Sequence, residues 1–449
     1  MQPKRSLIFG LIFLLTIGLC PTFLAQSSQP KKKIKDFGSS LKRLQWDPEK
    51  QTAVEVTTAA ANVDVDDVIR INTTLVTSDV LVLDRQGHNV TGLTAEDFIV
   101  TEDGEPQKVS HFLLGDNPNV PRTIVLIIDY SGSQLPYIRT SVEAAKTLVD
   151  KLNPRDRMAL VTDDVELIED FTDDKKKLKK KLDSLVDKAT RHGGFFGFKE
   201  RQLGRSDQYS ALMATLNEAF DDEDQRPIVV FQTDGDEAYR LRNPIVLPAL
   251  PPDVAPEISA KAEQGLRDQL EELERLRKSF SLEDLYRTAE KSRATIYTVI
   301  PGFRYMGLTP EQQVAQFQVE EEARAAQLVS QLPAERRKAI QKFIGVRKKM
   351  MTPANMLFYS ERNAKIQSAL AMVATLTGGW TDFLEKPSQA DEIYSRIFSD
   401  INQRYIVGYY PTNKEFDGKR RKIRIEVRGH PDYQISGRKS YYAPGPNNR

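Results

Sequence analysis

The chain has 449 residues, of which 40% are hydrophobic and 28% are charged, and its formal net charge is +1. This length allows about three domains. The composition supplies ordinary hydrophobic cores and excludes a chain that is disordered throughout. The near-zero net charge argues against a nucleic-acid-binding protein with a dominant basic face.

Residues 1–25 have the pattern of a Sec-type signal peptide. Two basic residues precede an apolar run from Leu7 to Leu19, and the small residue Ala25 closes the segment. The run is too short for a stable membrane span, although an uncleaved anchor stays open. We therefore expect an exported protein that is periplasmic, associated with the outer envelope or extracellular, with no membrane span after signal cleavage.

Cys20 is the single cysteine of the chain. Lipidation at Cys20 stays open, but Leu19 stands where a lipoprotein signal usually has a small residue. Cleavage beyond Cys20 would leave a protein without thiols or disulfides, which must rely on its hydrophobic cores and on bound metal. Residues 26–64 are polar and show no clear period, so we predict a solvated linker there.

A buried strand is predicted at Ile124–Ile128, because an uninterrupted aliphatic run is typical of a central parallel strand covered on both faces. Asp129, Ser131 and Ser133 follow this strand, and an amphipathic helix is predicted at Ile138–Leu152. Open α/β sheets bind their ligands at the carboxyl ends of such strands. One carboxylate and two hydroxyl groups at that place are oxygen donors that suit Mg²⁺.

Two further segments follow the same plan of strand, turn and helix. Pro227 to Asp236 reads PIVVFQTDGD and contains a second buried strand, which ends near Asp234. Between the two strands, Gly204 to Leu212 reads GRSDQYSAL and leads into a helix. Ser206 in that segment is a candidate ligand or a helix N-cap, and the two roles are compatible.

These three segments together resemble the metal-ion-dependent adhesion site of von Willebrand factor type A domains. The resemblance implies a site for Mg²⁺ or Mn²⁺ formed by Asp129, Ser131, Ser133, Ser206 and Asp234. Ser206 stands where the family has threonine, which keeps a hydroxyl group. The resemblance also implies a doubly wound, mostly parallel, Rossmann-like α/β sheet. In the family, an Asp or Glu of a protein partner fills an open position on the metal.

The segments on either side, 65–117 and 404–444, are rich in alternating apolar residues and turn signals. Neither has enough strands to close a core alone. We therefore predict one β-sandwich built from both, with the A-type domain at 118–403 inserted between them. Val90 to Phe112 resembles the segment before the A domain in exported von Willebrand factor A-related proteins, which are catalogued chiefly in acidobacteria.

Two helical insertions are predicted within the A-type domain, at 237–280 and 305–360, because their apolar residues recur at helical spacing. Each insertion follows the carboxyl end of a predicted sheet strand, and those ends share one edge of a parallel sheet. We therefore expect the insertions to surround the metal site and to contribute to the choice of partner.

A metal-dependent adhesion or protein-binding module is the favoured function, and no enzyme activity is expected. A phosphatase of the haloacid dehalogenase type also has an aspartate after its first strand, but Ser131 stands where it needs a general acid. A serine hydrolase would need a GxSxG elbow, which Ser131 lacks. A structural part of an envelope assembly with a vestigial metal site stays open. The sequence does not indicate the partner or the oligomeric state.

Overall fold

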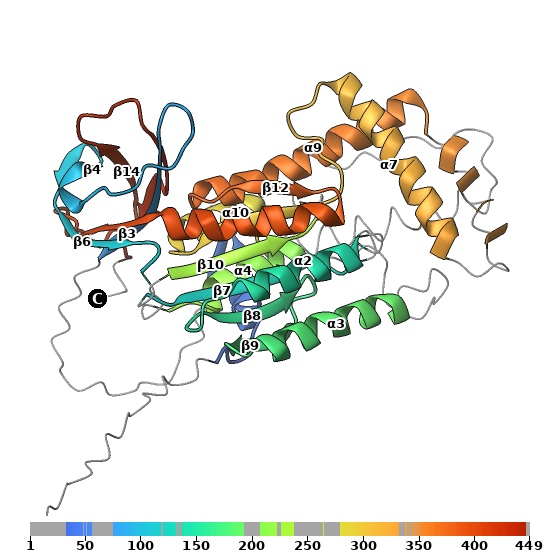
Figure 1. The fold of residues 1–449 in the computed structure, drawn as a ribbon, viewed down its shortest axis with the longest axis horizontal. Helices are drawn as coiled ribbons and strands as arrows, with labels where there is room; N and C mark the ends of the chain where they lie inside the picture. Colours follow the sequence, from blue (N-terminus) through green and yellow to red (C-terminus); the bar gives the residue numbers. More distant parts are fainter. Residues whose placement is uncertain are drawn as a thin grey trace, which may run out of the picture. The chain divides into compact units, whose positions relative to one another are not determined.

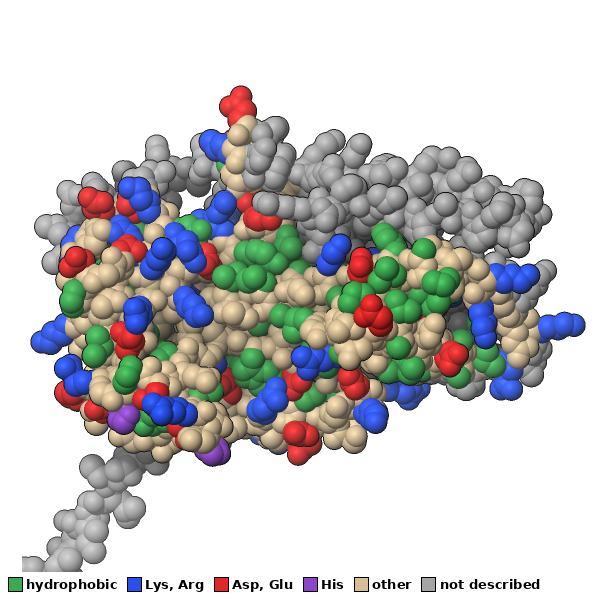
Figure 2. All heavy atoms as spheres, turned by 90° about the horizontal axis from the view of Figure 1, so that it is seen from above, with side chains coloured by type: hydrophobic (Ala, Val, Ile, Leu, Met, Phe, Trp, Pro, Cys, Tyr) green, Lys and Arg blue, Asp and Glu red, His purple; other side chains and the backbone are tan. Residues whose placement is uncertain are grey.

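The computed structural model describes residues 33–47, 49–50, 52–55, 75–117, 120–131, 134, 137–192, 207–221, 226–237, 264, 279–331, 337–338, 341, 344–345, 347–349 and 351–445. The predicted signal peptide and most of the first predicted insertion lie outside these ranges. No helix within them is long and apolar enough to cross a membrane. On the face seen in Figure 2, basic and acidic side chains are interspersed.

A six-stranded sheet lies at the centre of the fold (Figure 1). Its strands are β7 (Arg122–Ile128), β8 (Arg157–Thr162), β9 (Leu167–Thr172), β10 (Arg226–Gln232), β11 (Thr295–Pro301) and β12 (Thr381–Leu384). They follow the order β12-β11-β10-β7-β8-β9, and all neighbours are parallel except β8 and β9. The strands β8 and β9 lie on one side of β7, and β10, β11 and β12 lie on the other. This order confirms the predicted doubly wound, mostly parallel sheet.

Helices cover both faces of this sheet. They are α2 (Ile138–Asp150), α3 (Lys175–His192), α4 (Gln208–Glu218), α6 (Leu282–Lys291), α9 (Pro353–Leu376) and α10 (Ala390–Gln403), with a short 3₁₀ helix, η4, at Pro387–Gln389. A further helix, α7 (Pro310–Gln331), packs against α9. Successive residues of β7 pack on opposite faces of the sheet. Leu126 packs in one core with α2, α3 and α10, and Ile127 packs in a second core with α4, α6 and α9. Burial on both faces explains why β7 has no polar alternation.

A β-sandwich is built from the two segments that flank the A-type domain. Its strands are β3 (Val76–Leu83), β4 (Phe98–Glu102), β5 (Glu105–Gln107), β6 (Val109–Leu114), β13 (Tyr405–Tyr409), β14 (Arg420–Val427), β15 (Gln434–Ser436) and β16 (Ser440–Tyr442), with a 3₁₀ helix, η1, at Ala95–Asp97. The two sheets have the orders β15-β3-β13-β6 and β16-β14-β4-β5. Each sheet mixes strands from both segments, and a shared core joins them. The predicted sandwich is confirmed.

The described part of residues 26–64 is not a solvated linker, and that prediction is wrong for these residues. They form α1 (Ser39–Arg43) and a hairpin of β1 (Leu44–Asp47) and β2 (Thr52–Glu55). Glu218 of α4 accepts hydrogen bonds from the backbone N–H groups of Gly38 and Ser40, both at 2.8 Å. Asp284 of α6 accepts one from the backbone N–H of Ala53 at 3.1 Å. Local composition did not reveal this packing because the carboxylate partners lie far away in the sequence.

In the second insertion, α7 packs against α9, and the rings of Phe317 and Tyr359 stack with their centroids 5.9 Å apart. The predicted end of this insertion at residue 360 falls inside α9, which begins at Pro353 and continues to Leu376. Pro353 starts this helix and does not break it, because proline is tolerated in the first turn. The side chain of Thr352 caps the helix by accepting from the backbone N–H of Asn355.

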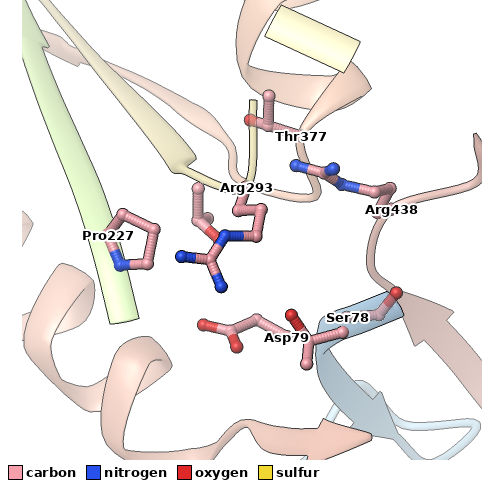
Figure 3. A pocket seen from close by; sticks show the side chains of 8 residues that line it. Ser78, Asp79, Pro227, Arg293, Thr377 and Arg438 are labelled. Atoms are coloured by element: carbon pink, nitrogen blue, oxygen red, sulfur yellow. The ribbon is translucent and has the colours of Figure 1, made fainter. Parts of the chain in front are cut away.

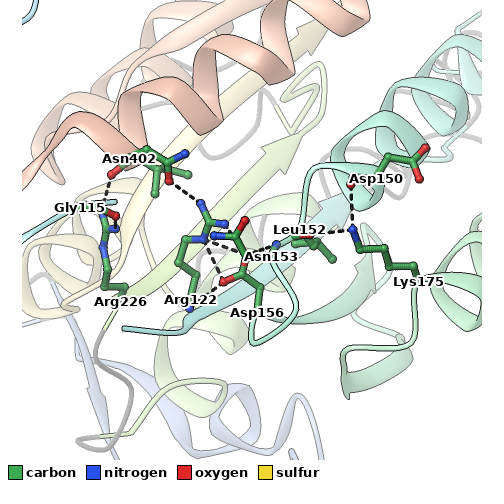
Figure 4. Close-up of polar contacts among 10 residues, drawn as sticks. Gly115, Arg122, Asp150, Leu152, Asn153, Asp156, Lys175, Arg226 and Asn402 are labelled. Carbon is green, nitrogen blue, oxygen red and sulfur yellow. Dashed lines mark hydrogen bonds and ion pairs between the residues drawn. The ribbon is translucent and has the colours of Figure 1, made fainter. Parts of the chain in front are cut away.

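Buried arginines at the amino edge of the sheet form hydrogen bonds with neighbouring segments (Figure 4). Arg122, the first residue of β7, donates from Nε to Oδ2 of Asp156 at 2.9 Å and from Nη1 to Oδ1 of Asn402 at 2.9 Å. Arg226, the first residue of β10, donates to the main-chain carbonyl groups of Gly115 and Ile401, both at 2.6 Å. These contacts join β7 and β10 to α10 and to the end of the flanking segment 65–117.

A small polar cavity lies beside Pro227 at the same edge, lined also by residues of β3 and of the segment after β15. Figure 3 shows the carboxylate of Asp79 and the guanidinium of Arg293 pointing toward one another there, with Arg438 nearby. The cavity volume is about 10 Å³, which is enough for about one water molecule. This edge has no room for a larger ligand at that point.

Candidate metal centre

Two predicted ligands meet at the opposite, carboxyl edge of the sheet. β7 and β10 pair in parallel register up to Ile128 and Gln232. Asp129 comes directly after β7, and its backbone N–H donates to the carbonyl oxygen of Gln232 at 2.9 Å. Asp234 follows β10 after one intervening residue, Thr233. The register therefore brings the carboxylates of Asp129 and Asp234 to one place, where the strand order reverses and open α/β sheets bind ligands.

Neutral donors surround the Asp129 carboxylate, which is 2% exposed. Its Oδ1 accepts the backbone N–H of Ser131 at 2.9 Å, and the Ser131 side chain also bonds to this carboxylate. Its Oδ2 accepts the hydroxyl of Thr233 at 2.8 Å and Nε2 of Gln208 at 2.7 Å. Ser131 thus lies in contact with Asp129, and its role as a metal ligand stays a prediction.

The Asp234 carboxylate shares one of these donors. Its Oδ1 accepts the backbone N–H of Asp236 at 2.9 Å and Nε2 of Gln208 at 3.3 Å. Its Oδ2 accepts Nε2 of Gln134 at 2.6 Å. The Gln208 amide therefore bridges the two carboxylates, and all the hydrogen-bond donors named for both are neutral.

A third carboxylate adds negative charge. Asp163 follows β8, the neighbour of β7, and its Oδ1 accepts the backbone N–H of Tyr130 at 3.1 Å. Burial raises the pKa of Asp129 well above its usual value, and the charges of Asp163 and Asp234 raise it further. Like charges that are buried together disfavour ionisation. A divalent cation at this place would offset that repulsion.

The residues present fit a hard divalent cation. The side chains of Gln134 and Gln208 are fully buried, and their Oε1 atoms have no hydrogen-bond partner among the described residues. Carboxylate, hydroxyl and amide oxygens are the ligands that Mg²⁺ and similar ions prefer. Within the described ranges, no group of three or more His, Cys, Asp or Glu side chains forms a metal cage. The donor set therefore combines carboxylates with neutral oxygens.

Two of the predicted ligands, Ser133 and Ser206, lie outside the described residues, and their roles stay predictions. The helix after Ser206, α4, begins at Gln208 and has Asp207 at its N-cap position. The Asp207 side chain makes no capping hydrogen bond there. The sequence reasoning missed Gln134, Gln208 and Thr233. Of these, Thr233 had a visible signal, because it stands directly beside Asp234 at the end of a strand.

No family model matches the chain, and no curated protein does. Solved von Willebrand factor A domains are among the matching structures. The vWF domain of the type V pili tip protein Mfa5 from Porphyromonas gingivalis is 12% identical, with 63% of this chain and 95% of that chain covered and a TM-score of 0.32.

Two other matching structures have similar TM-scores. An aerotolerance-related membrane protein from Bacteroides fragilis is 12% identical, with 63% of this chain and 99% of that chain covered and a TM-score of 0.27. Proximal thread matrix protein 1 from the mussel byssus, solved with a zinc-occupied MIDAS motif, is 11% identical, with a TM-score of 0.28. The match covers 63% of this chain and 48% of the mussel chain. At TM-scores this low, we build no functional argument on these matches.

Proposed function

We propose that this chain is an exported, metal-dependent protein-binding or adhesion module. A Mg²⁺ or Mn²⁺ ion would be held by Asp129, Ser131, Ser133, Ser206 and Asp234, and a protein partner would present an Asp or Glu side chain to it. The observation that carries the proposal is the meeting of two carboxylates from adjacent parallel strands with neutral oxygen donors around them. The bound ion would supply an electrophilic site for the partner's carboxylate.

The charge of the donor set supports an acidic partner. A divalent ion held by Asp129 and Asp234 has its charge balanced by these two ligands, while the serine ligands and the glutamine amides add none and Asp163 lies outside the proposed ligand set. Such an ion keeps its affinity for a further anionic oxygen when one coordination position stays open. A partner's carboxylate is the protein side chain best suited to that position.

A cavity beside Asp234 offers a route to the site. Its volume is about 190 Å³, and it is lined by Asp234, by Gly302 after β11 and by residues of α7 and α9. Most of the charges that line it are paired: Arg362 with Asp236, Arg324 with Glu320 at 2.6 Å, and Arg347 with Glu321 at 2.9 Å. Asp234 is held by glutamine amides instead, which leaves it suited to a metal.

This cavity also supports a part for the second insertion in partner selection. Arg324 and Glu320 belong to α7, within the insertion, and Arg362 follows the insertion on α9. A partner side chain that approaches the ion past Asp234 would therefore meet charged groups of the insertion. Loops and insertions on a rigid scaffold commonly set specificity in this way. The first insertion, 237–280, remains a prediction in this respect.

The proposal is tested by capture of partners from envelope extracts, with the immobilised protein in Mg²⁺ or in chelator. Wild type is compared with Asp129→Ala and with Asp391→Ala, a matched control at an exposed carboxylate on α10. We expect wild type and D391A to retain the same partner only in Mg²⁺, and D129A to lose it. Changing the partner's acidic contact residue to its amide should also abolish capture.

Retention of the partner by D129A, or in chelator, would contradict the proposal. The alternative of a structural envelope component with a vestigial metal site predicts that metal changes neither partner binding nor thermal stability. A titration of thermal stability with Mg²⁺ and Mn²⁺ separates the two.

A further inference from the structure

Of the two polar atoms of the Gln208 side chain, only Nε2 forms hydrogen bonds with the described residues. Its Nε2 lies 2.7 Å from Oδ2 of Asp129 and 3.3 Å from Oδ1 of Asp234. Its Oε1 is buried and has no hydrogen-bond partner among the described residues. Burying a carbonyl oxygen without a donor is unfavourable, so such a group calls for an explanation. An ion that binds between the two carboxylates would explain this oxygen, because Oε1 could coordinate the ion.

The spacing of these atoms matches a coordination sphere. Adjacent ligands of an octahedral Mg²⁺ ion lie about 3.0 Å apart when each metal–oxygen distance is about 2.1 Å. The distances of 2.7 and 3.3 Å from Nε2 of Gln208 to the two carboxylates lie on either side of that value. A half-turn of the amide would exchange Nε2 and Oε1 and place an oxygen atom at the same corner. This terminal torsion is broad and roughly two-fold, so both orientations are accessible.

We propose that Gln208 is a ligand whose amide orientation depends on metal. In the metal-free protein, Nε2 donates to Asp129 and Asp234 and holds the two carboxylates together in place of a cation. In the loaded protein, Oε1 faces the ion and coordinates it. This inference rests on the proposed function, because it needs a cation between the same carboxylates. It adds a neutral ligand from α4, two residues beyond the predicted Ser206.

The inference has a consequence for affinity. An amide oxygen adds a hard ligand without adding negative charge, so the ion keeps its attraction for an acidic partner. The same amide also stabilises the metal-free carboxylates, so the site is already assembled before metal arrives. Loss of the amide removes a metal ligand and the preassembled arrangement of the carboxylates, and we expect these losses to outweigh the lost hydrogen bonds and to weaken metal binding.

The test measures Mn²⁺ affinity of the full chain by electron paramagnetic resonance, which detects the free ion. The variants are Gln208→Leu, Gln208→Glu and Gln313→Leu. Gln313 of α7 is a matched control: it is also buried, its Oε1 also lacks a partner among the described residues, and its Nε2 donates to the Leu308 carbonyl. We expect Q208L to bind Mn²⁺ at least about tenfold more weakly than wild type. Q208E should bind at least as tightly as wild type, and Q313L should match wild type.

A second readout follows the amide itself. With glutamine labelled at the side-chain nitrogen, the resonances that disappear in Q208L are those of Gln208. Saturating Mg²⁺ should shift these resonances in wild type, because their hydrogen bonds to the carboxylates are lost, and should leave those of Gln313 in place. The shift itself is measured in wild type, and only the assignment of the resonances uses Q208L.

The outcomes separate this inference from the proposed function. Mn²⁺ binding by Q208L that equals or exceeds wild type, or unshifted Gln208 resonances in Mg²⁺, would overturn the inference and leave the proposed function intact. Absence of Mn²⁺ binding by wild type, or equal binding by D129A, would overturn both.

Discussion

The paired strands β7 and β10 have opposite chemistry at their two ends. At the amino end, Arg122 and Arg226 stand opposite one another in the register, and both are buried. Arg122 contacts the carboxylate of Asp156 and the side chain of Asn402, and Arg226 contacts two main-chain carbonyl groups. Each of these cations therefore has anionic or polar acceptors supplied by the fold itself.

At the carboxyl end, the same strands bring Asp129 and Asp234 together among neutral donors. Two buried acceptors beside these carboxylates, the Oε1 atoms of Gln134 and Gln208, have no partner within the described residues. The comparison separates charged groups that stabilise the fold from charged groups that are suited to bind a ligand. At the amino end the guanidinium groups bond to acceptors of the fold, although Nε of Arg226 has no hydrogen-bond partner among the described residues. At the carboxyl end carboxylates gather among neutral donors, and this end is suited to bind a cation.

The largest expected effect on stability comes from a substitution at the amino end of β7. Replacing Arg122 with Met should lower the free energy of unfolding by about 3–5 kcal/mol, because Asp156 stays buried without its counterion. Urea denaturation followed by circular dichroism measures this. Arg424→Met is the control: the Arg424–Glu426 pair is exposed, so the change should stay within about 0.5 kcal/mol. A loss for R122M as small as that of R424M would show that the amino end does not stabilise the fold.

Much of this arrangement was predictable from local sequence. The uninterrupted apolar runs of β7 and β10 and the turns after them indicated the parallel sheet and placed Asp129, Ser131 and Asp234 at one edge. The sandwich was also predictable, because neither flanking segment has enough strands for a core of its own. The strands of both units have patterns that lie within a few consecutive residues, and the sandwich follows from the need of each flanking segment for further strands.

The remaining features depend on contacts between distant segments. Gln208 is an ordinary polar residue in the sequence, and its approach to Asp129 follows from how α4 packs on the sheet. The hairpin within residues 44–55 was mistaken for linker because the carboxylates that hold this region lie on α4 and α6. Ser133 and Ser206 stay predictions, because they lie outside the part of the chain that the structure describes.

A smaller effect is expected at the carboxyl end without metal. Thr233→Val removes the hydroxyl that donates to Asp129 at 2.8 Å and accepts from the backbone N–H of Gly235 at 3.0 Å. Hydrogen bonds to charged groups contribute about 1.5–3 kcal/mol, so metal-free stability should fall by about that much. Thr375→Val, at an exposed hydroxyl of α9, should change it by less than about 0.5 kcal/mol. Equal stability of T233V and wild type would mean that this bond does not hold Asp129.

The smallest effect on stability is expected from the first insertion. Residues 238–278 are replaced by a short Gly/Ser loop. Glu237 is kept because its Oε2 accepts the backbone N–H of Tyr209 at 2.6 Å, and Phe280 is kept because it is buried. The metal-dependent rise in melting temperature should stay as in wild type, while partner affinity or identity changes in a binding assay. If neither affinity nor identity changes, the insertion has no part in partner selection.

The central claim is that the carboxyl edge of the six-stranded sheet binds a divalent cation. A titration of the melting temperature with Mg²⁺ and Mn²⁺ tests it most directly, with wild type, Asp129→Ala and Arg424→Met. A ligand that binds only the folded protein stabilises it by about 2.7 kcal/mol at a concentration of one hundred times its Kd. We predict that the melting temperatures of wild type and R424M rise with metal concentration and that the melting temperature of D129A does not. No rise in wild type, or an equal rise in D129A, would contradict the claim.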